Sequence, residues 1–264
     1  MRNRILAIAL SLILGQTEAI AQGQATHSKL LRGGVEHSEA FPALPDYLKT
    51  GAIFDQSFLT QAPKLDKWYQ IPSWLAGEWL QEQETVTFTY DCNSHEQSNE
   101  PKTIMARETA QFGVQTDRQG GIWHCRIAAG GVADCGSYYS VALLSSQEPV
   151  EVSEDKVVIR SVFTEIRVAK ETNVIILALQ AESFSTYHPV RDGVLKTSTS
   201  VKFFEEDGSP KNEQRNVALD ERTASFKPLN LYKGRDLRKS FKEFLLQRGL
   251  PELVPADTTT QTDD

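Results

Sequence analysis

Several features that would point to a function are missing from this sequence of 264 residues. It has no Lys/Arg-rich block, which argues against a nucleic-acid partner or an anionic-membrane patch. Beyond the N-terminus, no stretch approaches the roughly 18 apolar residues of a membrane-spanning helix, so we expect no stable membrane insertion. The net charge of −7 is typical of a solvated acidic surface. Nothing in the composition identifies a protein partner.

Catalytic and cofactor motifs are missing as well. The chain has no Gly-x-Ser-x-Gly elbow, no Gly-rich phosphate loop and no His-Glu-x-x-His pair. His124 and Cys125 are adjacent in an expected strand, so their side chains point to opposite faces and cannot easily join Cys135 around one metal ion. We therefore assign no catalytic residue, no metal ligand and no cofactor.

Cysteine is scarce, with three residues in the whole chain. Ala129-Gly130-Gly131 is a natural turn between two apolar segments, and a hairpin there would bring Cys125 and Cys135 onto facing strands. An exported protein can oxidise such a pair. We predict a Cys125–Cys135 disulfide, which leaves Cys92 unpaired.

The N-terminus has the pattern of a secretory signal peptide. Arg2 and Arg4 precede an apolar run over residues 5–14, and Ala19-Ile20-Ala21 offers small residues at a cleavage site. The pattern predicts a signal peptide over residues 1–21, a mature chain that begins at Gln22, and an extracytoplasmic location, periplasmic or secreted. The alternative is a short membrane anchor that is not cleaved.

The rest of the chain divides by its patterning. Residues 22–65 read as a flexible leader with short helical turns, and residues 66–232 as one β domain. Residues 233–250 contain a helical segment, and the polar residues 251–264 read as a disordered tail.

Hydrophobic periodicity of two dominates residues 84–226. Val86, Phe88 and Tyr90 alternate with threonines, and similar alternation recurs in about eight segments joined by short polar turns. Short connections require antiparallel neighbours, and long strands of one meander tend to close because closure removes the exposed edges. We expect an all-β fold, a single antiparallel up-and-down β-barrel of about eight or more strands.

The period changes near the C-terminus. Leu237, Phe241, Phe244 and Leu245 have the spacing of one apolar helix face. Asp236 is placed to cap the start, and Gly249 stands where a helix ends. The spacing predicts an α-helix of about twelve residues, packed on the barrel.

A Gly-x-Trp at the start of the first long strand, an antiparallel meander and one C-terminal helix together resemble the calycin superfamily, lipocalins in particular. Gly77 and Trp79 match that motif. The resemblance implies that Trp79 closes the base of the barrel and that a basic residue from the last strand packs across its indole. Arg215 and Arg222 both qualify for that position.

An eight-stranded barrel can hold one small ligand. Aromatic residues on the central strands would line its lumen, and we predict that a small apolar ligand contacts them: Trp123, Tyr138, Tyr139, Phe163, Phe184 and Tyr187. One alternative is an interaction or assembly module whose barrel is filled by side chains. A second is a calycin-type enzyme that acts on a hydrophobic substrate, which would need an inward carboxylate or histidine.

Three carboxylates lie on strands with apolar neighbours: Glu108, Glu165 and Glu182. Facing inward, they would be polar anchors or acids. Facing outward or at the rim, they would be solvated surface groups, and the sequence favours this second interpretation because the strands are long enough to extend past the core.

Overall fold

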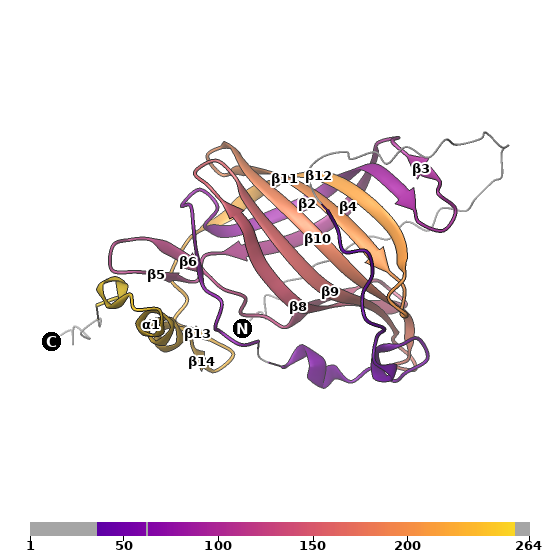
Figure 1. Ribbon diagram of the computed structural model, residues 1–264, viewed down its shortest axis with the longest axis horizontal. Helices are drawn as coiled ribbons and strands as arrows, with labels where there is room; N and C mark the ends of the chain where they lie inside the picture. Colours follow the sequence, from indigo (N-terminus) through magenta and orange to yellow (C-terminus); the bar gives the residue numbers. More distant parts are fainter. Residues whose placement is uncertain (1–35, 62, 257–264) are drawn as a thin grey trace.

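The computed structural model describes residues 36–61 and 63–256 (Figure 1). The signal peptide predicted over residues 1–21 lies outside the described residues. The described chain is mainly β-structure, arranged in antiparallel sheets with one α-helix. The all-β class and the antiparallel pairing are therefore confirmed.

The main sheet has nine strands: β2 (Gly77–Asp91), β3 (Gln97–Ser98), β4 (Lys102–Phe112), β7 (Gly130–Asp134), β8 (Tyr138–Val152), β9 (Val157–Ala169), β10 (Ile175–Arg191), β11 (Val194–Phe204) and β12 (Pro210–Ser225). Strands β7 to β12 follow one another as a meander. Strand β12 then pairs with β2, and β2 pairs on its other side with β3 and β4. Turns such as residues 192–193 between β10 and β11 are too short for any crossover, so every neighbour is antiparallel.

Closure of this sheet into a barrel is not detected. In the described part of the chain, no strand ladder joins β4 to β7 or β8. Strand β4 ends at Phe112, where Gly113 has a φ of 85°, and the chain leaves the main sheet. It forms instead a small sheet of β1 (Tyr69–Ile71), β6 (Ile122–His124) and β5 (Gln115–Thr116). Figure 1 nevertheless shows the main sheet strongly curved, with β2 and β4 lying behind β8 to β10.

The predicted turn at Ala129-Gly130-Gly131 is not a turn. Strand β7 begins at Gly130, and residues 135–137 make the turn into β8. Cys135 is therefore exposed at the turn, whereas Cys125 is buried upstream of β7. All three cysteines are free in the structure, so the predicted Cys125–Cys135 bond is not present in it.

The C-terminal helix is confirmed. Helix α1 (Leu237–Gln247) begins after Asp236, whose side chain accepts a hydrogen bond from the Lys239 N–H at 2.8 Å. Its apolar face consists of the four residues expected from the spacing. The face packs on Trp68 and Trp123 of the small-sheet region, with Trp123 5.5 Å from Phe241 between ring centroids. The remaining short elements are β13 (Leu231–Tyr232), β14 (Arg235–Asp236) and the 3₁₀ turn η3 (Pro251–Leu253).

Two segments expected to be flexible make ordered contacts. Residues 36–61 lie against the outer face of the main sheet and include the 3₁₀ turns η1 (Asp46–Leu48) and η2 (Gln56–Leu59). The Phe41 N–H donates to the Gly208 carbonyl and Gly51 to Ile175. In the tail, the Leu253 carbonyl accepts from the Arg118 N–H. These backbone bonds explain why both segments are held, and residues 257–264 of the predicted tail lie outside the described residues.

Candidate functional site

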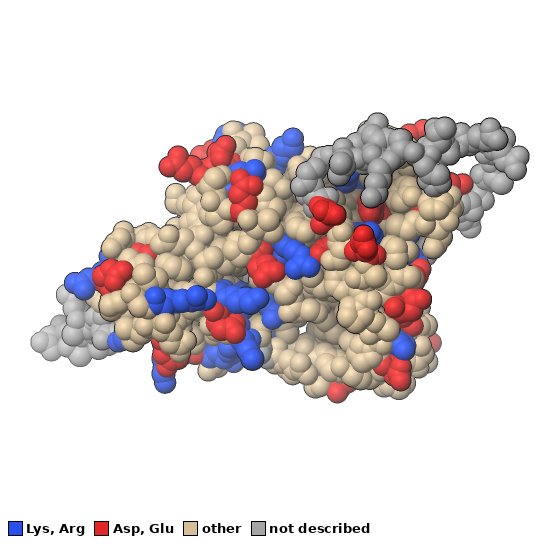
Figure 2. Space-filling model, in the orientation of Figure 1, with Lys and Arg blue, Asp and Glu red and all other residues tan. Residues whose placement is uncertain are grey.

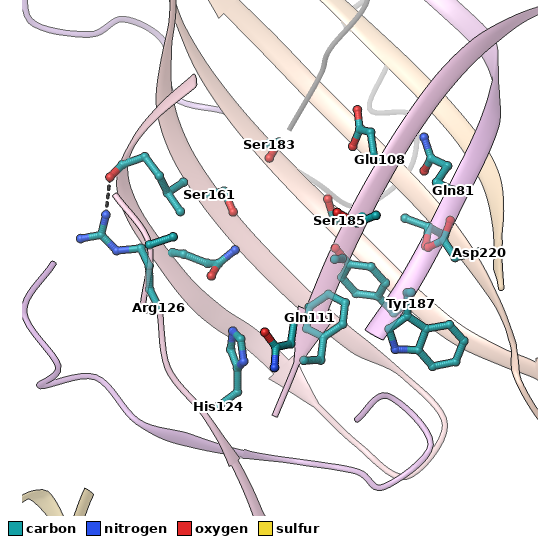
Figure 3. Close-up of a pocket in the computed structure, with 18 of the residues that line it drawn as sticks. Gln81, Glu108, Gln111, His124, Arg126, Ser161, Ser183, Ser185, Tyr187 and Asp220 are labelled. Carbon is teal, nitrogen blue, oxygen red and sulfur yellow. Dashed lines mark hydrogen bonds between the residues drawn. The ribbon is translucent and has the colours of Figure 1, made fainter. Parts of the chain in front are cut away.

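A cavity of about 250 Å³ lies on the inner face of the curved sheet, which we call the lumen. Side chains from β2, β4, β6 and β8 to β12 line it, so strands from both ends of the sheet order face the same space. Figure 3 shows polar groups from several strands pointing into this space. The lumen is therefore the place where side chains distant in sequence converge.

Trp79 forms an apolar base at one end of the lumen. Its side chain is 1% exposed and packs with Leu75, Ile159 and Leu195. The indole Nε1–H donates to the Leu75 carbonyl at 2.7 Å. Since this buried polar atom has a partner, the base carries no hydrogen-bonding penalty there.

Arg222, on the last long strand, packs across the indole of Trp79. Its guanidinium carbon lies 4.8 Å from the ring centroid, and its Nη2 donates to the Trp74 carbonyl at 2.8 Å. Arg215 lies instead over Phe88, at 5.0 Å. Of the two candidate arginines, Arg222 therefore occupies the position beside Trp79.

The same corner of the fold requires a glycine at position 77. Its φ is 138°, and a Cβ at this position would lie 2.6 Å from the Ala224 carbonyl oxygen on β12. Any side chain would force β2 and β12 apart. The glycine of the Gly-x-Trp pair thus allows the two strands to approach at the base.

Above the base, Glu84 of β2 heads a chain of polar side chains. The Asn216 amide donates to Glu84 Oε2 at 3.1 Å, and the Gln214 amide donates to Asn216 Oδ1 at 2.8 Å. Glu84 is 6% exposed. Burial raises the pKa of Glu84, and the Asn216 hydrogen bond opposes that rise.

Asp220 lies on β12 beside this chain. Its Oδ2 accepts a hydrogen bond from the Thr197 hydroxyl, and the residue is 7% exposed. Burial raises the pKa of Asp220, and the Thr197 hydrogen bond opposes the rise. Glu84 and Asp220 together form what we call the carboxylate belt of the lumen.

His124, on β6, faces the lumen from the opposite side (Figure 3). The Gly113 N–H donates to its Nδ1 at 3.2 Å, which places the ring proton of the neutral form on Nε2. Burial lowers the pKa of His124 to about 4, against a hydrogen bond with Gln147 that raises it. The imidazole is therefore neutral at pH 7.

The remaining wall combines small hydroxyls with an apolar end. Ser161, Ser183 and Ser185 line the cavity from β9 and β10 (Figure 3). Beyond them, Leu144 and Phe163 line the cavity as part of an apolar cluster that also contains Val201 and Phe203. The lumen thus has apolar surfaces at both ends and a polar middle.

Two of the six predicted ligand contacts line this cavity, namely Phe163 and Tyr187. Trp123 packs under α1 instead. Phe184 lies on the outer face against His37, with ring centroids 5.2 Å apart. Tyr138 and Tyr139 do not line the cavity: they lie beside Arg167 and Lys170, and Tyr139 is 39% exposed. Within β10, strand alternation separates Phe184 from Tyr187, because residues an odd number of positions apart point to opposite faces.

The three carboxylates singled out by the sequence have different environments. Glu108 lines the lumen. Glu182 lies on the outer face, 2.6 Å from Arg160, and accepts hydrogen bonds from Ser38. Glu165 is 2% exposed, and neither of its carboxylate oxygens has a hydrogen-bond partner among the described residues. The solvated surface or rim position favoured from the sequence is therefore wrong for Glu165 and for Glu182, which is 1% exposed. The lumen-side apolar cluster surrounds Glu165, and the segment around Ser38 covers Glu182.

The carboxylate belt was not predicted from the sequence. Glu84 and Asp220 stand in runs of consecutive polar residues, Gln81 to Thr85 and Asp220 to Thr223. Register shifts between Gln81 and Gln83 and between Ala218 and Asp220 also break the alternation around them. Such β-bulges change which face a side chain occupies. The signal in the sequence is a polar residue at a position that faces inward once both register shifts are taken into account.

Within residues 36–61 and 63–256, no group of three or more His, Cys, Asp or Glu side chains is arranged to hold a metal ion. In the same residues, no helix has the length and hydropathy of a membrane span.

Basic and acidic side chains are interspersed over the face seen in Figure 2. Comparison of the chain with protein-family models, curated proteins and solved structures gave no match.

Proposed function

We propose that this protein is a lipocalin-like binding protein that holds one small molecule in its lumen. The observation that carries the proposal is the cavity of about 250 Å³ bounded by strands from both ends of the sheet order. A cavity of roughly 150 Å³ is enough for benzene, so this one accommodates a ligand of about ten non-hydrogen atoms. The polar middle indicates a ligand with hydrogen-bonding groups as well as apolar surface.

A single barrel is part of the same proposal. The residues after β6 run beside β8, where the Leu144 N–H donates to the Ala129 carbonyl at 2.8 Å and Arg126 donates to the Leu144 carbonyl. In this proposal, the segment covers the side between β4 and β8 without a regular strand ladder. The pairing of Trp79 with Arg222 at the base supports the lipocalin resemblance.

An extracytoplasmic location belongs to the proposal too, and the signal-peptide pattern of residues 1–21 supports it. The ligand would then be taken from, or carried through, the extracytoplasmic space. The filled-barrel alternative is less favoured because side chains leave a cavity of ligand size.

Saturation-transfer NMR with uncharged aromatic fragments, such as 2-phenylethanol, tests the binding function. Ser183→Phe fills the middle of the lumen, and Thr186→Phe is its matched control on the outer face of β10. We expect fragments to bind the wild type and Thr186→Phe but not Ser183→Phe. Fragments that bind all three proteins equally would contradict the proposal, as would a wild type that binds neither these fragments nor charged analogues of the same size.

A further inference from the structure

The lining of the lumen is unbalanced in charge. It contains four carboxylates, from Glu78, Glu84, Glu108 and Asp220, but only one guanidinium, from Arg126. The Arg126 side chain donates to the Leu144 carbonyl, and Figure 3 places it across the cavity from Asp220. With His124 neutral, the side of the lumen formed by β2 and β12 presents negative charge and hydrogen-bond acceptors.

Two oxygens of the carboxylate belt lack partners. Glu84 Oε1 and Asp220 Oδ1 are buried and have no hydrogen-bond partner within the described part of the chain. Buried polar atoms are nearly always paired, and an unpaired one destabilises the fold. Because both residues are more than nine-tenths buried and line the same cavity, a donor brought by a ligand would satisfy them.

The two acids lie on one wall of the lumen. Glu84 pairs with Ala218 in the ladder between β2 and β12, and Asp220 is two residues further along β12. Ala218 and Asp220 share a face of β12, and the extra residue of the bulge lies on β2 between Gln81 and Glu84, so Glu84 and Asp220 both face the lumen. A single small ligand can therefore contact both.

We propose that the ligand is a small organic cation, a protonated amine on an apolar body, whose ammonium group is bound by Glu84 and Asp220. This inference rests on the proposed binding function and adds the chemical class of the ligand. An ammonium group has three donors, and its hydrogen bonds to carboxylates are stronger than neutral ones. The apolar body lies against Phe163 and Leu144 at the far end or Trp79 at the base.

Matched ligands that differ in one group test the inference. Phenethylamine, 2-phenylethanol and phenylacetate place an ammonium, a hydroxyl or a carboxylate at the same end of a similar body. Pentylamine and pentanol repeat the comparison without the ring. We expect calorimetric titration at pH 7.5 to show each amine binding at least tenfold more tightly than its alcohol, with phenylacetate the weakest.

Four variants locate the preference. Glu84→Gln and Asp220→Asn should each reduce the preference for amine over alcohol at least fivefold. The controls Glu82→Gln and Glu221→Gln remove exposed charges from the same two strands and should keep the preference. Binding of the uncharged fragments to all four variants, measured by the same NMR screen, would show that the lumen of each variant remains accessible.

The outcomes separate this inference from the function on which it rests. Alcohols or phenylacetate binding as tightly as the amines would overturn the amine assignment while the binding function stands. So would a preference that survives in both belt variants. If neither amines nor uncharged fragments bind the wild type, the binding function itself fails.

Discussion

The base of the lumen and its carboxylate belt lie on the same two strands, yet they are built in opposite ways. At the base, Trp79 donates to Leu75 and Arg222 donates to Trp74, so the indole N–H and the Arg222 Nη2 have partners. In the belt, Glu84 and Asp220 each retain one carboxylate oxygen without a partner among the described residues. The base is mainly apolar and leaves one buried atom, Arg222 Nε, without a partner among the described residues, whereas the belt leaves two carboxylate oxygens unpaired.

This difference indicates which of the two regions stabilises the fold and which one binds the ligand. A buried tryptophan contributes through the area that it removes from water, whereas a buried carboxylate without full pairing destabilises the fold. We infer that the base stabilises the protein and that the belt is maintained for its ligand.

Removal of the Trp79 side chain should have the largest effect. Trp79→Ala is expected to lower the free energy of unfolding by about 3–5 kcal/mol, as for other large-to-small substitutions of core aromatics. Denaturant titration measures this loss. Tyr139→Ala, at a side chain that is 39% exposed, is the control and should change stability by less than about 1 kcal/mol. Equal losses of unfolding free energy in the two variants would show that Trp79 stabilises the fold no more than a partly exposed side chain does.

Glu165 extends the comparison to a third buried acid, whose two carboxylate oxygens both lack hydrogen-bond partners among the described residues. Burial raises the pKa of Glu165 from 4.5 to about 7, and Arg167 opposes the rise. The folded protein therefore holds the Glu165 proton more tightly than the unfolded chain does. The stability that this proton contributes is fully present below pH 4.5 and is lost as the pH rises to 7. The loss amounts to about 3 kcal/mol, at ~1.36 kcal/mol per pKa unit.

The variant Glu165→Gln cannot ionise and isolates this effect. Its stability relative to the wild type should rise between pH 4.5 and pH 7 and then level off. Unfolding free energies from denaturant titration at several pH values give the difference curve. A flat difference curve would show that folding does not raise the pKa of Glu165.

Arg222 tests whether the base depends on its cation as well as its indole. Arg222→Met keeps much of the apolar side chain but removes the contact over Trp79 and the hydrogen bond to the Trp74 carbonyl. We expect a loss of about 1–3 kcal/mol, since each contact contributes roughly 1 kcal/mol. Arg215→Met, which removes a similar cation–π contact with Phe88, should cost less than Arg222→Met in the same denaturation assay.

The belt should show the smallest effect on stability, and one of opposite sign. The pKa values of Glu84 and Asp220 are raised by burial, so their ionised forms oppose folding at neutral pH. Glu84→Gln and Asp220→Asn should therefore stabilise the protein at pH 7 by up to about 1 kcal/mol. The gain should shrink as the pH falls toward about 4, the ordinary pKa of these acids, and should be absent below it. Thermal melts at pH 7 and at a pH below about 4 would record the change. Destabilisation at pH 7 would show that the belt acids contribute to the fold.

The parts that could be predicted from the sequence are those that depend on local patterns. Helix α1 follows from apolar spacing and the Asp236 cap, and the antiparallel meander follows from alternation with short turns. The position of Trp79 at a buried corner follows from its place beside Gly77. Each of these features is specified by residues close together in the chain.

The remaining features depend on register and on distant contacts. The extra residue near Thr87 puts Phe88 opposite Arg215 and away from Val86, so alternation alone mislocates it. Phe184 is on the outer face because its neighbour Ser183 lines the lumen. The contact of His37 with Glu182 joins residues 145 positions apart, and no local pattern indicates such a pairing.

The central claim is that the lumen binds a small molecule, and the most direct measurement locates that molecule. Titration of ¹⁵N-labelled protein with 2-phenylethanol, and then with phenethylamine, reports each perturbed amide by NMR. The account predicts shifts at inward positions of the lumen wall, such as Glu84, Ser183 and Asp220, with little change around His37 on the outer face. Shifts confined to the outer face, or no shifts with either ligand, would contradict it.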